Sequence, residues 1–134
     1  MSPRASAPED ARLARVTALC LSLPQTERAL RGDHADFRVR QKVFAYFLNS
    51  HHDDGIVSVC VRGESGEGAD RAARAPALYY LPAYIGARGW FGLRLDTHST
   101  DWREVSQLIE LSYCRIAPKK LARVVEERRT QAPP

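Results

Sequence analysis

Strand-like runs between residues 37 and 95 constrain this chain most, because they lie between two helical regions. β-Branched and aromatic residues dominate these runs, as is typical of strands. The runs are Phe37–Val39, Val43–Leu48, Ile56–Val61 and Trp90–Leu95. Gln41-Lys42 separates the first two and predicts a hairpin, while the polar segment 49–55 ends in glycine and predicts a turn. We therefore expect several short antiparallel strands.

Helical spacing of apolar residues marks both ends of the chain. Ser6 and Glu9 have the spacing of a capping box ahead of an amphipathic helix that ends near Pro24. Asp101 and Glu104 repeat this spacing ahead of a second helix. A short helix over 69–75 and a last helix from 118 to 127 complete the pattern. Because helices and strands are segregated along the chain, the predicted class is α+β.

Length and composition predict one globular domain. The chain has 134 residues, 44% hydrophobic and 27% charged. We expect the domain to span 8–128, between flexible segments at 1–7 and 129–134. No apolar run approaches the roughly 20 residues that span a bilayer. Three scattered cysteines suit neither disulfides nor zinc, so a cytoplasmic protein is expected.

Positive charge is concentrated at the C-terminal end. The net charge is +4, and residues 115–134 alone carry six basic and two acidic side chains. Such a segment attracts phosphate groups, although a solvated helix face has the same composition.

Three ordered segments resemble the MmcQ/YjbR-like family of small bacterial proteins. They are Asp36–Ala45, Leu81–Trp90 and Ser112–Leu121, with Leu95-Asp96 and Asp101-Trp102 between the last two. The resemblance covers about residues 13–125. It implies a frataxin-like (CyaY-like) layout, a twisted antiparallel sheet with helices packed on one face. It also implies DNA binding by a double-wing-like arrangement, without catalytic residues or cofactors.

Basic side chains in three parts of the chain are the first candidate site. They are Arg38, Arg40, Lys42, Arg88, Lys119, Lys120 and Arg123. The first three alternate in sequence, which predicts that they share one strand face. If the groups converge, they suit phosphate, with Trp90 or Tyr84 stacking on a base. The alternative is an ordinary solvated surface.

A second candidate is a ligand pocket near Tyr84 and Trp90. Gly86 and Gly89 lie between the two aromatic residues and allow a close backbone approach. A turn leading Trp90 into the core is the alternative interpretation.

The histidines and Ser112 are weak candidates for a metal site or a catalytic site. The segment 51–54 contains metal-ligand residue types, but adjacent residues on one turn rarely converge on one ion, so no metal site is predicted. His34 with Asp33 and Asp36 resembles an acid–base pair, with Ser112 as a nucleophile. Ser112 lies on a helix without a nucleophile elbow, which favours a packing role.

These observations rank three functions. The first is a non-enzymatic domain whose basic face binds DNA, without a cofactor or a membrane. The second is a small-molecule binding or enzymatic domain that uses the pocket near Tyr84 and Trp90. The third is a protein–protein adaptor, which would expose a flat apolar patch.

Overall fold

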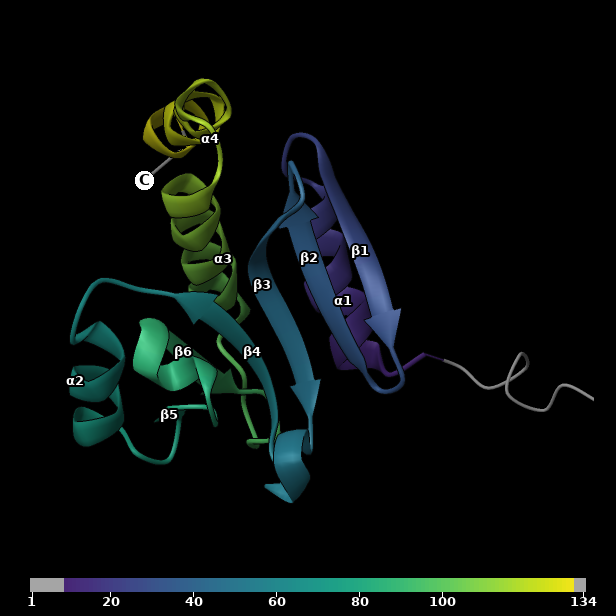
Figure 1. Cartoon of the computed structure of the whole chain (residues 1–134), viewed down its shortest axis with the longest axis vertical. Helices are drawn as coiled ribbons and strands as arrows, with labels where there is room; N and C mark the ends of the chain where they lie inside the picture. The colour runs from purple at the N-terminus through teal and green to yellow at the C-terminus, as the bar shows by residue number, and fades with distance from the viewer. Residues whose placement is uncertain (1–8, 132–134) are drawn as a thin grey trace, which may run out of the picture.

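A computed structural model describes residues 9–131 of the chain. Within these residues, α-helices are packed against a six-stranded antiparallel sheet, the last of them packs on the helix before it, and two short 3₁₀ helices lie in the connections (Figure 1). The helices are α1 (Ala11–Leu21), α2 (Glu67–Arg74), α3 (Trp102–Ile116) and α4 (Lys119–Gln131). The strands are β1 (Thr26–Arg31), β2 (His34–Val39), β3 (Lys42–Asn49), β4 (Val57–Arg62), β5 (Tyr79–Tyr80) and β6 (Trp90–Arg94). The 3₁₀ helices are η2 (His51–Asp53) and η3 (Ile85–Arg88). The predicted α+β class is confirmed.

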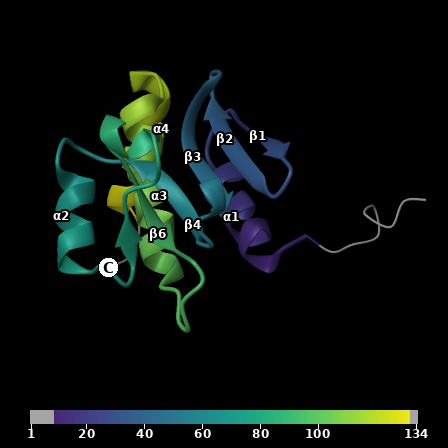
Figure 2. The same ribbon diagram turned by 60° about the horizontal axis from the view of Figure 1, so that its bottom comes forward.

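The sheet runs in the order β1-β2-β3-β4-β6-β5. One face is apolar, because Phe37, Phe47, Val59 and Leu93 point from successive strands into the core. The α1 and α3 helices cover this face and lie behind the strands in Figure 1. Figure 2 shows α2 and α1 at opposite ends of the sheet. The other face of the sheet, which we call the open face, carries no α-helix among the described residues.

A bulge and a tight turn shape the β2–β3 hairpin. The register shifts after Phe37, so Phe44 is an extra residue in β3 and joins Ala45 in the core. Arg40 and Gln41 form the turn with φ values of 50° and 71°, without the glycine that this geometry usually selects. The turn thus falls one residue before the predicted Gln41-Lys42.

The segment 63–89 leaves the sheet after β4 and returns at β6. Its two ends meet, because the Gly63 N–H donates to the Gly89 carbonyl oxygen at 2.9 Å. Between these points the chain builds α2, β5 and η3. Only two residues of the apolar run 77–84 form a strand, namely Tyr79 and Tyr80. We call this segment the excursion.

Helix boundaries partly follow the predicted caps. The Asp101 carboxylate accepts hydrogen bonds from the backbone N–H groups of Arg103 and Glu104, which confirms the predicted cap of α3. The predicted cap at Ser6 lies outside the described residues, and α1 begins later, with Asp10 as its N-cap. Helix α4 continues to Gln131, beyond the predicted domain end at 128. The β1 strand had no sequence signal, because its residues 26–31 are mostly exposed or half-buried.

Within residues 9–131, no helix combines the length and the apolar character that crossing a membrane requires. Cys20 and Cys60 are buried and Cys114 is half-buried, as unpaired thiols.

Candidate functional site

A cleft of about 720 Å³ lies where the tip of the β2–β3 hairpin meets the junction of α3 and α4. Five basic residues line it: Arg40, Lys42, Arg115, Lys119 and Arg123. Ile116, Ala117, Pro118 and Ala122 contribute the apolar part of the wall. Among the described residues that line the cleft, only Glu126 is acidic. We call this feature the basic cleft.

Most cations of the basic cleft lack a neutralising partner. The Arg40 Nε donates to the neutral Gln25 side chain at 2.7 Å. Within the described part of the chain, no carboxylate lies within 4.0 Å of Arg40, Lys42, Lys119 or Arg123. All four side chains belong to exposed residues. Apart from Glu126 in the same lining, solvent is what relieves their mutual repulsion, and an anion would relieve it further.

The local backbone explains how these side chains converge. The left-handed turn at Arg40 and Gln41 reverses the chain above the end of α3. Ala117 is extended and precedes Pro118, so α3 stops there and α4 starts afresh. Lys119 is the first residue of α4, where a cation opposes the helix dipole. The sequence therefore places positive charge at a position that helix stability disfavours.

Arg38 does not belong to the basic cleft, which corrects the prediction that Arg38, Arg40 and Lys42 share a strand face. Lys42 pairs with Val39, whose side chain is in the core, and partners across a ladder share a face. Lys42 thus leaves the sheet on the helix side. Arg38 lies on the open face, where its Nη2 contacts the Asp36 carboxylate at 3.0 Å. The bulge and the turn break the simple alternation on which the prediction relied.

Arg88 and Trp90 line a different cavity, of about 390 Å³, between the loop after β4 and η3. Lys120 is exposed on α4 but is not among the residues lining the basic cleft. Of the seven predicted basic residues, the structure therefore gathers four, and it adds Arg115. Arg115 could have been identified from its place in the C-terminal basic segment.

The predicted pocket residues Tyr84 and Trp90 do not line a common cavity. Tyr84 is 77% exposed and packs on His52, with ring centroids 4.7 Å apart. Trp90 is only 8% exposed and packs edge-on against Tyr46 at 5.0 Å. Trp90 thus offers little free ring for stacking on a base, whereas Tyr84 keeps an exposed ring.

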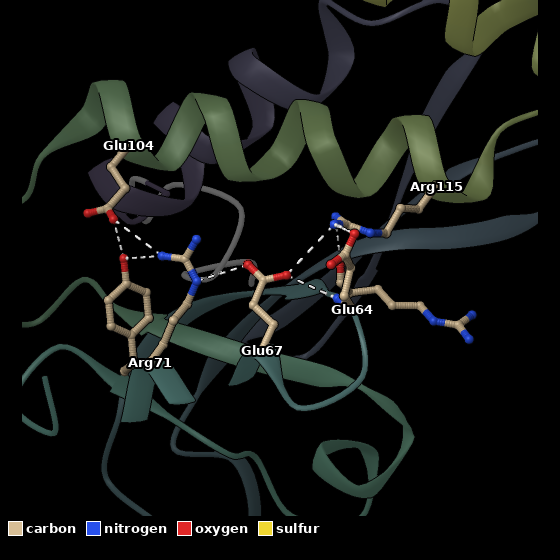
Figure 3. Close-up of polar contacts among 7 residues, drawn as sticks. Glu64, Glu67, Arg71, Glu104 and Arg115 are labelled. Carbon is tan, nitrogen blue, oxygen red and sulfur yellow. Dashed lines mark hydrogen bonds and ion pairs between the residues drawn. The ribbon is translucent and has the colours of Figure 1, made fainter. Parts of the chain in front are cut away.

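A chain of ion pairs joins the excursion to α3 (Figure 3). Arg71 donates to Glu67 at 2.9 Å and to the Tyr79 hydroxyl at 3.1 Å, and the Tyr79 hydroxyl donates to Glu104. Burial and then the bond to Glu104 raise the pKa of Tyr79 to about 12. No sequence signal pointed to this network, because its members are far apart in the chain. It joins α2 and β5 to α3.

The same network restrains Arg115 at the edge of the basic cleft. Its Nη2 lies 3.6 Å from Glu64 and 3.7 Å from Glu67, and its Nη1 donates to the Arg62 carbonyl oxygen at 3.4 Å. Burial opposes ionisation of Glu67, but hydrogen bonds from the Glu64 N–H and Arg71 leave its pKa lowered. Arg115 therefore contributes less free charge to the cleft than the four unpaired cations.

Ser112 is fully buried and has a structural role. Its hydroxyl donates to the Phe44 carbonyl oxygen at 2.6 Å and accepts from the Arg62 N–H at 3.0 Å. The hydroxyl is thereby committed to the backbone of two strands, as expected for a packing role. His34 accepts the Asn49 N–H at its Nδ1, at 3.1 Å. Between residues 9 and 131, no three His, Cys, Asp or Glu side chains are grouped closely enough to hold a metal ion.

An antiparallel sheet with helices on one face and a basic cleft at one end defines a class of small α+β domains. The YjbR family pattern matches residues 21–115, so the chain belongs to the YjbR family. A solved structure with a similar fold is that of protein DR2400 from Deinococcus radiodurans, described as containing a DUF419 domain. The two share 14% sequence identity, with a TM-score of 0.64 over 85% of this chain and 87% of that chain. No curated protein sequence matches this chain.

Proposed function

We propose that this protein binds nucleic acid through the basic cleft, without catalysing a reaction. The observation that carries the proposal is the convergence of four unpaired cations, Arg40, Lys42, Lys119 and Arg123, on one concave surface. Two separate parts of the chain supply them, namely the β2–β3 hairpin and the first turns of α4. A phosphate backbone is an anion that could contact several of them at once.

The cleft supports recognition of the backbone and not of the bases. Among the described residues, its lining has apolar positions but no aromatic ring on which a base could stack. Phosphate contacts position a protein on nucleic acid and carry no sequence information. Binding is therefore expected to tolerate any sequence. It should also depend strongly on salt, because each neutralised phosphate releases counterions.

The salt dependence can be estimated from the number of cations. Four phosphate contacts correspond to a slope of about −3 to −4 in a plot of log affinity against log salt. A fourfold rise in salt then lowers the affinity roughly a hundredfold. Fluorescence anisotropy with labelled single- and double-stranded DNA measures this slope. An affinity that does not change with salt would refute the phosphate account.

Adjacent lysines provide a matched pair of variants. Lys119 lines the basic cleft, whereas Lys120 is exposed on the same helix but does not line it. Both Lys119→Ala and Lys120→Ala remove one charge from the same helical turn. We expect Lys119→Ala to reduce affinity several-fold more than Lys120→Ala, and to reduce the salt slope by about one. Equal losses in the two variants would mean that net charge, and not the cleft, governs binding.

A further inference from the structure

A pocket of about 330 Å³ lies on the open face of the sheet, between β2, β3 and η2. Its polar lining comprises Arg31, His34, Asp36, Arg38, Tyr46 and His51. Apolar side chains, including Val43 and Leu48, complete the wall. None of these residues lines the basic cleft, so the two sites are separate. We call this second site the sheet-face pocket.

Three polar atoms in the lining of this pocket are buried without a hydrogen-bond partner. They are Oδ1 of Asp36, Nε of Arg38 and Nδ1 of His51. Folded proteins rarely leave such atoms unsatisfied, since each costs about 1–3 kcal/mol. Of the four side-chain atoms in this condition within residues 9–131, three belong to residues that line this single pocket. The concentration indicates a site built to receive a polar ligand.

Asp36 is the centre of the arrangement. Its side chain is only 6% exposed, and its Oδ2 contacts Arg38 at 3.0 Å and Arg31 at 3.4 Å. Both arginines approach the same oxygen, which leaves Oδ1 as a buried acceptor. The Nη2 of Arg38 contacts Oδ2 of Asp36, and the Nε–H of the same guanidinium group is a buried donor without a partner. A free acceptor and a free donor therefore belong to one ion pair.

This combination restricts the chemistry of a ligand. A simple anion would meet the Asp36 carboxylate, and a simple cation would meet two guanidinium groups. A neutral ligand that carries a donor next to an acceptor satisfies both Oδ1 and Nε. The His34 Nδ1 already accepts the Asn49 N–H, so the ring proton of His34 is on Nε2 and can donate. Tyr46 and His51 add flat rings to the wall.

We propose that the sheet-face pocket binds a planar heterocycle of the nucleobase type, whose N–H donates to Asp36 and whose adjacent carbonyl accepts from Arg38. The volume is at the lower end of the range for ligand sites, which suits one base with its sugar. The ligand could come as a free nucleoside or as one base of a single strand. The chemistry recognised by the pocket is the same in both cases.

Isothermal titration calorimetry with uridine and 3-methyluridine tests the proposal directly. Methylation of N3 removes the donor and keeps the ring, so we expect 3-methyluridine to bind about tenfold or more weakly than uridine. Equal binding of the two would overturn recognition through this edge. No binding of uridine, cytidine, adenosine or guanosine at millimolar concentration would overturn the pocket itself.

Two pairs of variants assign the binding to this pocket. Asp36→Asn should weaken uridine binding at least tenfold, whereas Asp33→Asn, on the exposed β1–β2 turn, should leave it unchanged. His51→Ala should weaken binding, whereas His52→Ala removes a neighbouring ring that does not line the pocket. The His51→Ala and His52→Ala variants provide the test if Asp36→Asn fails to fold. A loss that is equal within each pair would contradict the assignment.

The source of the base is distinguished with a labelled oligothymidylate of about ten nucleotides. If it binds and both Asp36→Asn and Lys119→Ala weaken it, the pocket takes a base from a strand held in the basic cleft. Binding that only Lys119→Ala weakens would leave the proposed function intact and would restrict the pocket to free nucleosides. Uridine binding without oligonucleotide binding would support the pocket and contradict the proposed function.

Discussion

Replacing Ser112 by alanine tests how the sheet is attached to its covering helix. The hydroxyl of this residue reaches from α3 to two strands, donating to the Phe44 carbonyl at 2.6 Å and accepting from the Arg62 N–H at 3.0 Å. Phe44 is the extra residue of the β-bulge, and Arg62 ends β4. The single hydroxyl therefore satisfies one backbone group on each of two neighbouring strands.

The expected loss follows from the two bonds. The Ser112→Ala variant leaves a backbone C=O and a backbone N–H without their partner, and each unsatisfied buried group costs about 1–3 kcal/mol. Alanine recovers about 0.5 kcal/mol through its higher helix propensity. The net loss in the free energy of unfolding is therefore about 1.5–5.5 kcal/mol. A domain of this size has about 5–15 kcal/mol in total, so the variant should fold but unfold much earlier.

Urea unfolding followed by circular dichroism measures this loss. Ser106→Ala is the matched control, because Ser106 lies on the same helix, is half-buried and makes no side-chain hydrogen bond within residues 9–131. We expect the control to be neutral or slightly stabilised. If Ser112→Ala differs from Ser106→Ala by less than about 0.5 kcal/mol, the two hydrogen bonds do not contribute as argued.

Three further predictions concern packing and ionisation. Gly92→Ala should destabilise the fold by about 1–3 kcal/mol in urea unfolding, because a Cβ at that position would overlap the Tyr80 ring; the additional change Tyr80→Ala should remove most of that clash. The pKa of Tyr79 is raised from 10.0 to about 12, so the folded state holds this proton more tightly. Stability is therefore expected to fall as pH rises from 10.0 to 12, and Tyr79→Phe should flatten that part of the profile. The hydrogen bond from the Arg12 guanidinium lowers the pKa of Asp10 from 3.8 to about 2. The stability that this interaction adds is therefore present above pH 3.8 and is lost as pH falls to 2. An acid unfolding profile for Asp10→Asn that is parallel to that of the wild type would contradict this.

Sequence reasoning located most of the fold, because the buried strands and helices carry clear apolar patterns. The strand Val57–Arg62 and the helix Trp102–Ile116 were predicted closely. β1 was missed, because an edge strand whose residues are all half-buried or exposed needs no apolar alternation. The N-cap of α3 was predicted correctly, because Asp101 is the one capping residue directly before the apolar pattern of that helix. The N-cap of α1 is Asp10 and not the predicted Ser6, because several polar residues that can cap a helix precede α1.

The candidate sites were harder to predict than the fold. Convergence of the hairpin turn on the start of α4 depends on tertiary packing, so the sequence suggested the basic residues but not their grouping. A one-residue bulge and a turn of two left-handed residues separated Arg38 from Lys42, and neither has a strong local signal. Asp36 appeared only as part of a possible acid–base pair, because burial of a carboxylate cannot be read from its neighbours in the chain.

The hydrogen bond between Gly63 and Gly89 affects how the excursion unfolds locally and how far its sequence can vary. Because the excursion leaves and re-enters the sheet at one point, β4 and β6 remain paired whatever the intervening residues do. The ion pairs of Arg71 with Glu104 and of Arg115 with Glu67, together with the pairing of β5 with β6, hold it to the rest. We expect its amides to exchange with solvent as one cooperative unit, ahead of the central strands. No described residue of the excursion lines the basic cleft, and of the residues that do, Arg115 forms ion pairs with it. Changes in its length and sequence that keep Glu64 and Glu67 should therefore leave the cleft intact, so surface features that are specific to one protein can evolve here on a constant scaffold.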